Sequence, residues 1–142
     1  MDNLKLIALD ADDLEVISAH LEDSLIRLGD MVYLPKEKKF VFTTQRMDWE
    51  TSQPDDPHYN LTGVHFERVT AVRSRGLDLS NKDATLCLLA IVFNEKDKPS
   101  GTATLVFTRY VEIELEIECI EVQMKDLGIV PSEALKETRA QD

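Results

Sequence analysis

The sequence has 142 residues, with 16 lysines and arginines against 27 aspartates and glutamates, and a formal net charge of -11 at pH 7. This length fits one domain, and a hydrophobic content of 43% excludes a disordered chain. An excess of acid of this size opposes general affinity for nucleic acid phosphates and for anionic membranes, so we expect neither as a partner.

Two features of the sequence predict a cytoplasmic protein. The start "MDNLKLIALDADD" lacks the basic leader and apolar core of a signal peptide, and the longest apolar run, "LCLLAIVF", is too short to span a bilayer. Cys87 lies inside that run and Cys119 follows a strand-like alternation. Both are predicted to be small buried hydrophobic residues in a reducing compartment, since their spacing fits no redox or metal motif.

The first elements in chain order are a strand over "LKLIAL" and a helix over "DADDLEVISAHLED". Asp10 can cap the helix, and Asp12 and Asp13 lie in the first turn, where the helix dipole favours negative charge. Apolar residues then recur at helical spacing and predict one buried stripe. The residues of this stripe are Leu14, Ile17, Leu21 and Leu25.

The middle of the chain has a period of two. "SLIRLGDMVYL" and "FVFTTQRMDW" flank the turn "PKEKK" and predict an antiparallel hairpin. A polar segment over residues 50–63 predicts a loop, and "VHFERVTAVRSRGLDL" follows it as strand. Its inward register shifts near Glu67 and Arg68, which predicts a β-bulge or a break between two strands. "LCLLAIVF" predicts a central strand covered on both faces, and "TATLVF" pairs with it.

The last regular segment is "YVEIELEIE", whose apolar residues alternate strictly with glutamates. This alternation predicts a strand with one core face and one face of carboxylates. Beyond it, apolar residues step by three or four from Ile117 through Ile120 and Met124 to Leu127, and Gly128 stands where a helix would end. The spacing predicts a short C-terminal helix.

Together these elements predict an α+β fold. We expect a single antiparallel β-rich domain over residues 1–128, a meander or half-barrel of about seven strands with one N-terminal and one C-terminal helix, since consecutive strands with short turns favour antiparallel pairing. Residues 129–142 are predicted to be a polar tail. The alternative is a pleckstrin-homology-like barrel, from which the helix between the first two strands departs.

The basic residues Arg68, Arg73 and Arg75 stand close together in this acidic sequence. On a strand, Arg73 and Arg75 share a face, and two guanidinium groups at that spacing can hold a phosphate or a carboxylate. The same residues can instead pair with glutamates on a neighbouring strand, the row from Glu112 to Glu118 above all. The sequence leaves open whether these arginines bind an anion.

Other candidate residues carry weaker signals. The glutamate row does not converge as calcium ligands do, and Asp55, Asp56 and His58 lack a second cluster that would complete a metal site. No catalytic residue, metal ligand or cofactor is therefore predicted. Trp49 lies where a strand meets the long loop, and with Tyr59 of that loop it can form an exposed aromatic contact for a partner protein; alternatively, Trp49 is a lid over the end of the core.

Several segments together resemble a known family. "LKLIALDADDLEVISAHLED", "GDMVYLPKEKKFVF", "FERVTAVRSRGLD", "PSGTATLVF" and "ECIEVQMKDLG" are similar to an uncharacterised family of small alphaproteobacterial proteins, known only as a domain of unknown function. The resemblance covers the chain from Leu4 to about Gly128. It implies a one-domain cytoplasmic bacterial protein and brings no activity or site residues with it.

Three classes of function remain. The first is a non-enzymatic interaction module that binds a partner protein through strand edges and the region from Trp49 to Tyr59. The second is a small-molecule or anion-binding domain that uses Arg68, Arg73 and Arg75. The third is an enzyme whose site is assembled from residues distant in the sequence. We expect the first, because no nucleophile, phosphate loop or metal motif is present.

Overall fold

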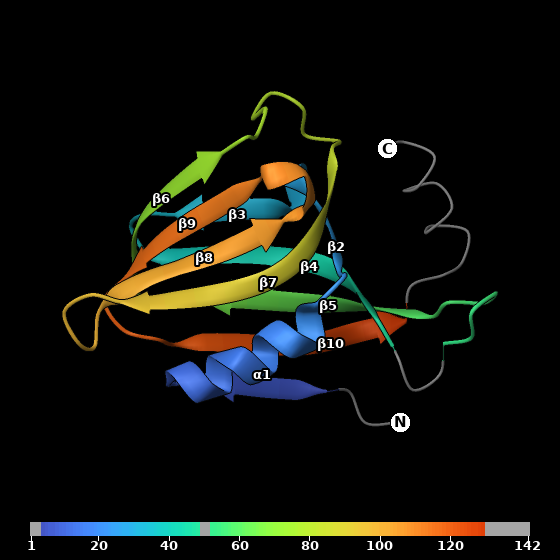
Figure 1. The fold of residues 1–142 in the computed structure, drawn as a ribbon, viewed down its shortest axis with the longest axis horizontal. Coiled ribbons are helices and arrows are strands. Elements are labelled where there is room, and N and C mark those ends of the chain that lie inside the picture. The colour runs from blue at the N-terminus through green and yellow to red at the C-terminus, as the bar shows by residue number, and fades with distance from the viewer. Residues whose placement is uncertain (1–3, 49–51, 130–142) are drawn as a thin grey trace.

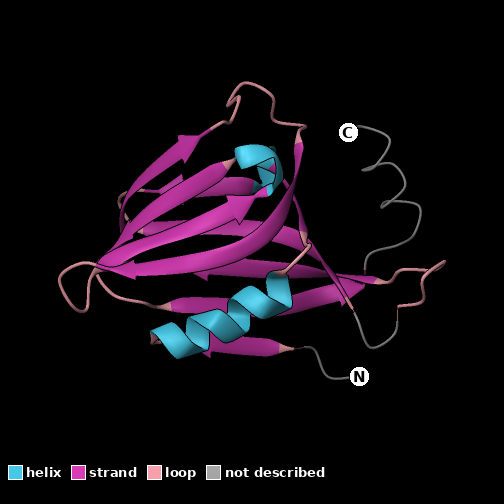
Figure 2. Cartoon of the chain, viewed as in Figure 1, coloured by secondary structure: helices cyan, strands magenta, loops and turns pink. Residues whose placement is uncertain are grey.

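The computed structural model describes residues 4–48 and 52–129, which form ten strands in one antiparallel sheet and one α-helix (Figures 1 and 2). The elements are β1 (Lys5–Ala8), α1 (Ala11–Leu21), β2 (Leu25–Arg27), η1 (Leu28–Asp30), β3 (Met31–Leu34), β4 (Lys39–Met47), β5 (Tyr59–Phe66), β6 (Val69–Arg75), β7 (Thr85–Glu95), β8 (Gly101–Phe107), η2 (Thr108–Tyr110), β9 (Glu112–Ile117) and β10 (Val122–Ile129), where η1 and η2 are short 3-10 turns.

The sheet has the order β1-β10-β5-β4-β2-β7-β8-β9-β6, and β3 lies beside β4. In Figure 1 it curls on itself, so that β7, β8 and β9 lie in front of β4. The curl encloses one hydrophobic core, to which Phe42 of β4, Phe66 of β5 and Leu105 of β8 all contribute fully buried side chains. The strands pair antiparallel, but the predicted seven-strand α+β meander is wrong, because β1 and β10, β5 and β10, β2 and β7, and β6 and β9 are neighbours that are not consecutive in the chain.

The predicted C-terminal helix is wrong, because Ile117 ends β9 and the residues from Val122 onward form the strand β10. This strand pairs with β1 on one side and with β5 on the other. Val122, Met124 and Asp126 are buried on one face, which is the alternation of a strand. A register shift between Asp126 and Gly128 then displaces Leu127, so the apolar residues fall at spacings that imitate a helix. The pleckstrin-homology-like alternative fails for the same reason.

The count of about seven strands is also wrong, because two predicted strands each contain two. The segment "SLIRLGDMVYL" is divided by the turn η1 into β2 and β3. The stretch from Val64 is divided at Arg68, whose backbone is left-handed with φ 62, into β5 and β6. The predicted break between two strands near Glu67 and Arg68 is thereby confirmed. With β10, these divisions account for all ten strands of the described sheet.

Helix α1 begins and packs as the sequence predicted. The Asp10 carboxylate accepts a hydrogen bond from the Asp13 amide at 2.8 Å, which caps the helix. Leu14, Ile17 and Leu21 are buried in the core. Leu25, predicted as part of this stripe, lies in β2 instead. In Figure 1 α1 lies beside β1 at the lower side of the molecule, and it contacts β7, β1 and β4.

Strand β7 is central in the sheet but is not covered on both faces. Beyond the residues paired with β2, its edge is completed by the end of α1 and the residues after it: the Ile91 amide donates to Ser18 Oγ at 2.8 Å, and the Leu88 amide donates to the Ser24 carbonyl at 2.9 Å. Leu89 and Val92 are exposed. The prediction of two covered faces is therefore wrong, and the continuous apolar run reflects one core face and one partly open face.

Candidate functional site

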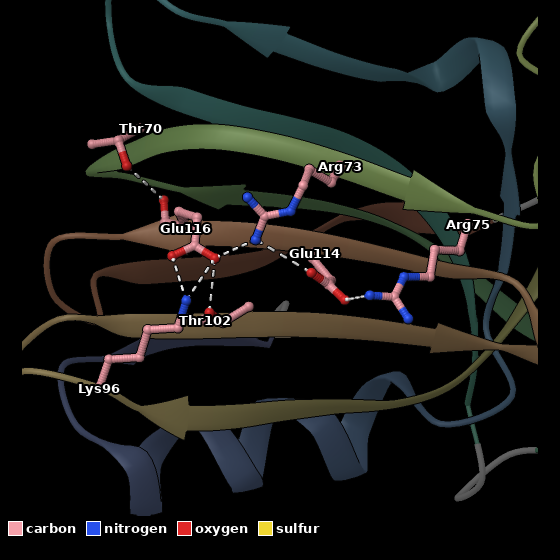
Figure 3. Close-up of polar contacts among 7 residues, drawn as sticks. All are labelled: Thr70, Arg73, Arg75, Lys96, Thr102, Glu114 and Glu116. Atoms are coloured by element: carbon pink, nitrogen blue, oxygen red, sulfur yellow. Dashed lines mark hydrogen bonds and ion pairs between the residues drawn. The ribbon is translucent and has the colours of Figure 1, made fainter.

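Arg73 and Arg75 project from β6 over the carboxylates of β9 (Figure 3). The register places Arg73 opposite Glu114. Arg73 Nη2 lies 2.6 Å from Glu116 Oε1 and 3.3 Å from Glu114 Oε2, and Arg75 Nη2 lies 3.4 Å from Glu114 Oε1. Cross-strand pairing, one of the two alternatives for these arginines, is the arrangement in the structure: Arg73 pairs with two carboxylates and Arg75 makes one longer ion pair.

Glu116 is the centre of this row of ion pairs. Its carboxylate also accepts from Thr102 Oγ1 at 2.9 Å and from Lys96 Nζ at 3.3 Å (Figure 3). Partial burial raises the pKa of Glu116, but the hydrogen bonds from Thr102, Arg73 and Lys96 outweigh it and leave the pKa below the ordinary value of 4.5. The hydrogen bonds that Arg73 donates, to Glu116 first and then to Glu114, raise the pKa of Arg73. The carboxylate therefore stays ionised and holds three strands together.

Arg68 does not join the other two arginines. It lies in the turn between β5 and β6, and its Nε is 3.8 Å from the carboxylate of Glu121. Its carbonyl accepts from the Glu118 amide at 3.0 Å. The structure thus brings Arg73 and Arg75 together and leaves Arg68 at the opposite end of β6.

The turn between β8 and β9 presents a feature that the sequence did not reveal. Arg109 and Tyr110 are consecutive residues with φ 64 and φ 62, as in a type I′ hairpin turn. Residues other than glycine rarely adopt this left-handed backbone conformation, which costs roughly 1–2 kcal/mol for each residue. Tyr110 is nevertheless 97% exposed, so burial of its ring does not offset that cost. The fold holds an aromatic side chain fully in solvent on a strained turn.

This turn packs directly against the end of β6. Gly76 follows Arg75 with φ +72, and a Cβ placed on it would come within 2.9 Å of the Tyr110 carbonyl oxygen. Only glycine fits there without a shift of the backbone. Arg75, Arg109 and Tyr110 therefore form one exposed corner of the molecule, which we call the arginine–tyrosine corner.

Of the two residues predicted to contact a partner, Trp49 and Tyr59, the structure describes only Tyr59. Trp49 lies outside the described residues. Tyr59 is the first residue of β5 and is 4% exposed, so its ring belongs to the interior rather than to a contact surface. Of the predicted loop over residues 50–63, the last five residues belong to β5, and the Gln53 and Asp56 backbones form an isolated bridge.

A buried ion pair was also missed by sequence reasoning. Arg46 Nη2 donates to Asp126 Oδ2 at 2.6 Å, Arg46 Nε donates to Asp126 Oδ1 at 3.2 Å, and Thr62 Oγ1 donates to the same Oδ1 at 2.8 Å. The three side chains come from β4, β10 and β5 and point inward at one end of the core. The signal was present in β4, where Arg46 continues the buried alternation of Phe40 and Phe42.

Neither thiol chemistry nor metal binding is indicated by the described residues. Cys87 and Cys119 are free and half-buried, which corrects their predicted full burial. Partial burial, with a contribution from Asp23, raises the pKa of Cys87, so this thiol is a weak nucleophile at neutral pH. Within residues 4–48 and 52–129, no three acidic, histidine or cysteine residues converge as metal ligands do.

One hollow on the described part of the chain, of ≈ 320 Å³, is open and lies between the start of α1, Phe93 and Cys119. Another, of ≈ 30 Å³, lies beside β2. Neither is lined by Arg68, Arg73 or Arg75. The side chains of these arginines are exposed, and they face solvent and glutamates.

The described residues define a small antiparallel β-domain with one α-helix. The chain belongs to the family described as "Protein of unknown function (DUF2948)", whose family model matches residues 4–138. No curated protein and no solved structure matches the chain. None of the described helices combines the length and the apolar composition required to cross a membrane.

Proposed function

We propose that this protein is a non-enzymatic interaction module of the bacterial cytoplasm that binds a partner protein through the arginine–tyrosine corner. The observation that carries the proposal is Tyr110, which is 97% exposed on a turn of two left-handed residues. Strain of this kind persists where the surrounding structure enforces it, and it gathers at functional positions. Tyrosine and arginine are the residue types that dominate binding energy in protein interfaces.

The chemistry of the surface supports binding over catalysis. The carboxylates of Glu114 and Glu116 on β9 are engaged by Arg73, Arg75 and Lys96, and the half-buried thiol of Cys87 has a raised pKa. Two cysteines without a disulfide support a reducing compartment. The contact surface differs from the predicted region of Trp49 and Tyr59, since Tyr59 is buried.

Site-specific photo-crosslinking in cells tests this proposal. A photoreactive phenylalanine analogue is placed at position 110, and the matched control carries it in place of Val32, an apolar residue of β3 that is also exposed. The proposal requires discrete crosslinked products from position 110 that the control at position 32 does not give. Identical products from both positions, or none from position 110, would contradict it.

A further inference from the structure

The strand β6 has one edge that the described part of the chain leaves largely unpaired. Its other edge pairs with β9, and β6 stands last in the strand order. Only its first residue is tied elsewhere: the Val69 amide donates to the Lys38 carbonyl at 2.8 Å, and Tyr33 Oη donates to the Val69 carbonyl at 3.2 Å. Over residues 70–75, the backbone groups of this edge have no backbone partner outside β9 among the described residues. Such an edge is a template for another strand.

The end of this edge carries exposed positive charge in a chain of net charge -11. The Arg75 side chain is 73% exposed and makes a single long ion pair, at 3.4 Å. Arg109 is exposed and forms no ion pair with any described residue. These two side chains and Tyr110 lie at the end of β6, because the turn packs against Gly76. A segment that added to β6 would meet these groups, and carboxylates would complement them.

We propose that the free edge of β6 accepts an extended, acidic segment of the partner protein by strand addition. The inference rests on the proposed function and specifies the chemistry of its partner. Backbone hydrogen bonds along residues 70–75 would supply affinity, while alternate side chains on the outer face would meet Arg73 and Arg75. Tyr110 would pack over the end of the added strand.

The molecule already contains a strand with the required pattern. On its paired edge, β6 is hydrogen-bonded to β9. The outward residues of β9, Glu112, Glu114 and Glu116, alternate with buried apolar residues. Arg73 contacts two of these carboxylates. An added segment with the same alternation of acidic and apolar residues would repeat those contacts on the other side of the same arginines.

A peptide with the sequence of residues 111–118, "VEIELEIE", is therefore a suitable probe. Titrated into isotope-labelled protein, it should shift the amide resonances of residues 70–76 and slow their hydrogen exchange. A second peptide of the same sequence, N-methylated at alternate residues so that one edge has no N–H donors, keeps the side chains and should bind several-fold more weakly. The variant Arg75→Gln should also bind the unmodified peptide several-fold more weakly, whereas Lys98→Gln, on the distant β7–β8 turn, should bind it as wild type does.

The outcomes separate this inference from the proposed function. Equal binding of both peptides, resonance shifts confined to residues outside β6, or no binding would overturn strand addition. In each of these cases discrete crosslinks from position 110 would still support the interaction module. Loss of those crosslinks together with normal peptide binding would overturn the proposed function and leave the β6 edge as a peptide site.

Discussion

Arg46 and Asp126 show how a polar pair is accommodated inside a β-rich core. Their side chains are 9% and 6% exposed, and two hydrogen bonds between them are joined by one from Thr62. Removing water from two charges is costly, and only well-formed pairing offsets that cost. The pair, together with Thr62, therefore links β4, β5 and β10. It stabilises the fold only when both charged partners are present.

Replacing one partner should be far more harmful than replacing both. Asp126→Ala leaves a buried guanidinium without its carboxylate and should lower the free energy of unfolding by about 3–5 kcal/mol. The double variant Arg46→Met with Asp126→Leu should recover most of that loss, because no buried charge remains. Urea denaturation of the wild type, Arg46→Met, Asp126→Leu and the double variant measures the coupling. Additive effects of the two replacements would contradict the description of the pair.

Glu116 should make stability depend on pH. Its pKa in the folded protein lies below the ordinary value of 4.5, so it contributes stability above pH 4.5 that is lost as the pH falls through the folded pKa. The difference in unfolding free energy between wild type and Glu116→Gln should thus be largest near neutral pH and shrink in acid. Glu112→Gln is the control, since Glu112 lies on the same strand and forms no ion pair with the described residues. A gap that stayed constant with pH would argue against the ion pairs of Glu116.

At the scale of elements, the sequence predicted those parts whose periodicity is uninterrupted. Helix α1 has a capping aspartate and a regular apolar stripe, and β9 alternates without a break, so each follows from local pattern alone. The strand β10 was mistaken for a helix because the shift at Leu127 disturbs its period. The turn η1 was not predicted, so β2 and β3 were counted as one strand. The register shift near Glu67 and Arg68 did indicate a bulge or a break, but β5 and β6 were still counted as one strand.

The candidate site could likewise be predicted from the sequence only in part. Arg73 and the glutamate row were recognised because both follow strand alternation and lie on neighbouring strands. The partners Arg46 and Asp126 are 80 residues apart, and no local pattern joins them. Tyr110 gave no signal, because a lone tyrosine after a strand is usually packed, and only the backbone of its turn places it in solvent.

The turn at Arg109 and Tyr110 should be replaceable by one of lower energy. Asparagine followed by glycine is the pair that favours two positive φ angles in a hairpin. Arg109→Asn with Tyr110→Gly should therefore raise the free energy of unfolding, by about 1 kcal/mol or more, because strain is removed and no buried contact is lost. Chemical denaturation of this variant beside wild type measures the gain. A clear loss of stability would show that the two side chains stabilise the fold.

At the scale of the whole molecule, the net charge of -11 opposes the binding of small free anions by long-range electrostatics, and such anions would have to compete with the carboxylates that pair with Arg73 and Arg75. A thermal melting scan against phosphate and small carboxylates should show no increase in Tm for wild type. The double variant Arg73→Gln with Arg75→Gln should melt modestly lower than wild type with or without these anions. An increase in Tm confined to wild type would instead favour an anion-binding domain, since a ligand that binds only the folded state stabilises it.

The variant Tyr110→Asn tests the proposed contact surface directly. It removes the exposed aromatic side chain and keeps a residue that tolerates a left-handed backbone. Partners identified by crosslinking from position 110 are captured in parallel on wild type, Tyr110→Asn and the control Val32→Ala. The account predicts that Tyr110→Asn folds at least as stably as wild type and loses capture of these partners by about tenfold or more, as expected for an aromatic hot spot. Val32→Ala should retain them. Undiminished capture by a stably folded Tyr110→Asn would contradict the claim that this corner is the contact surface.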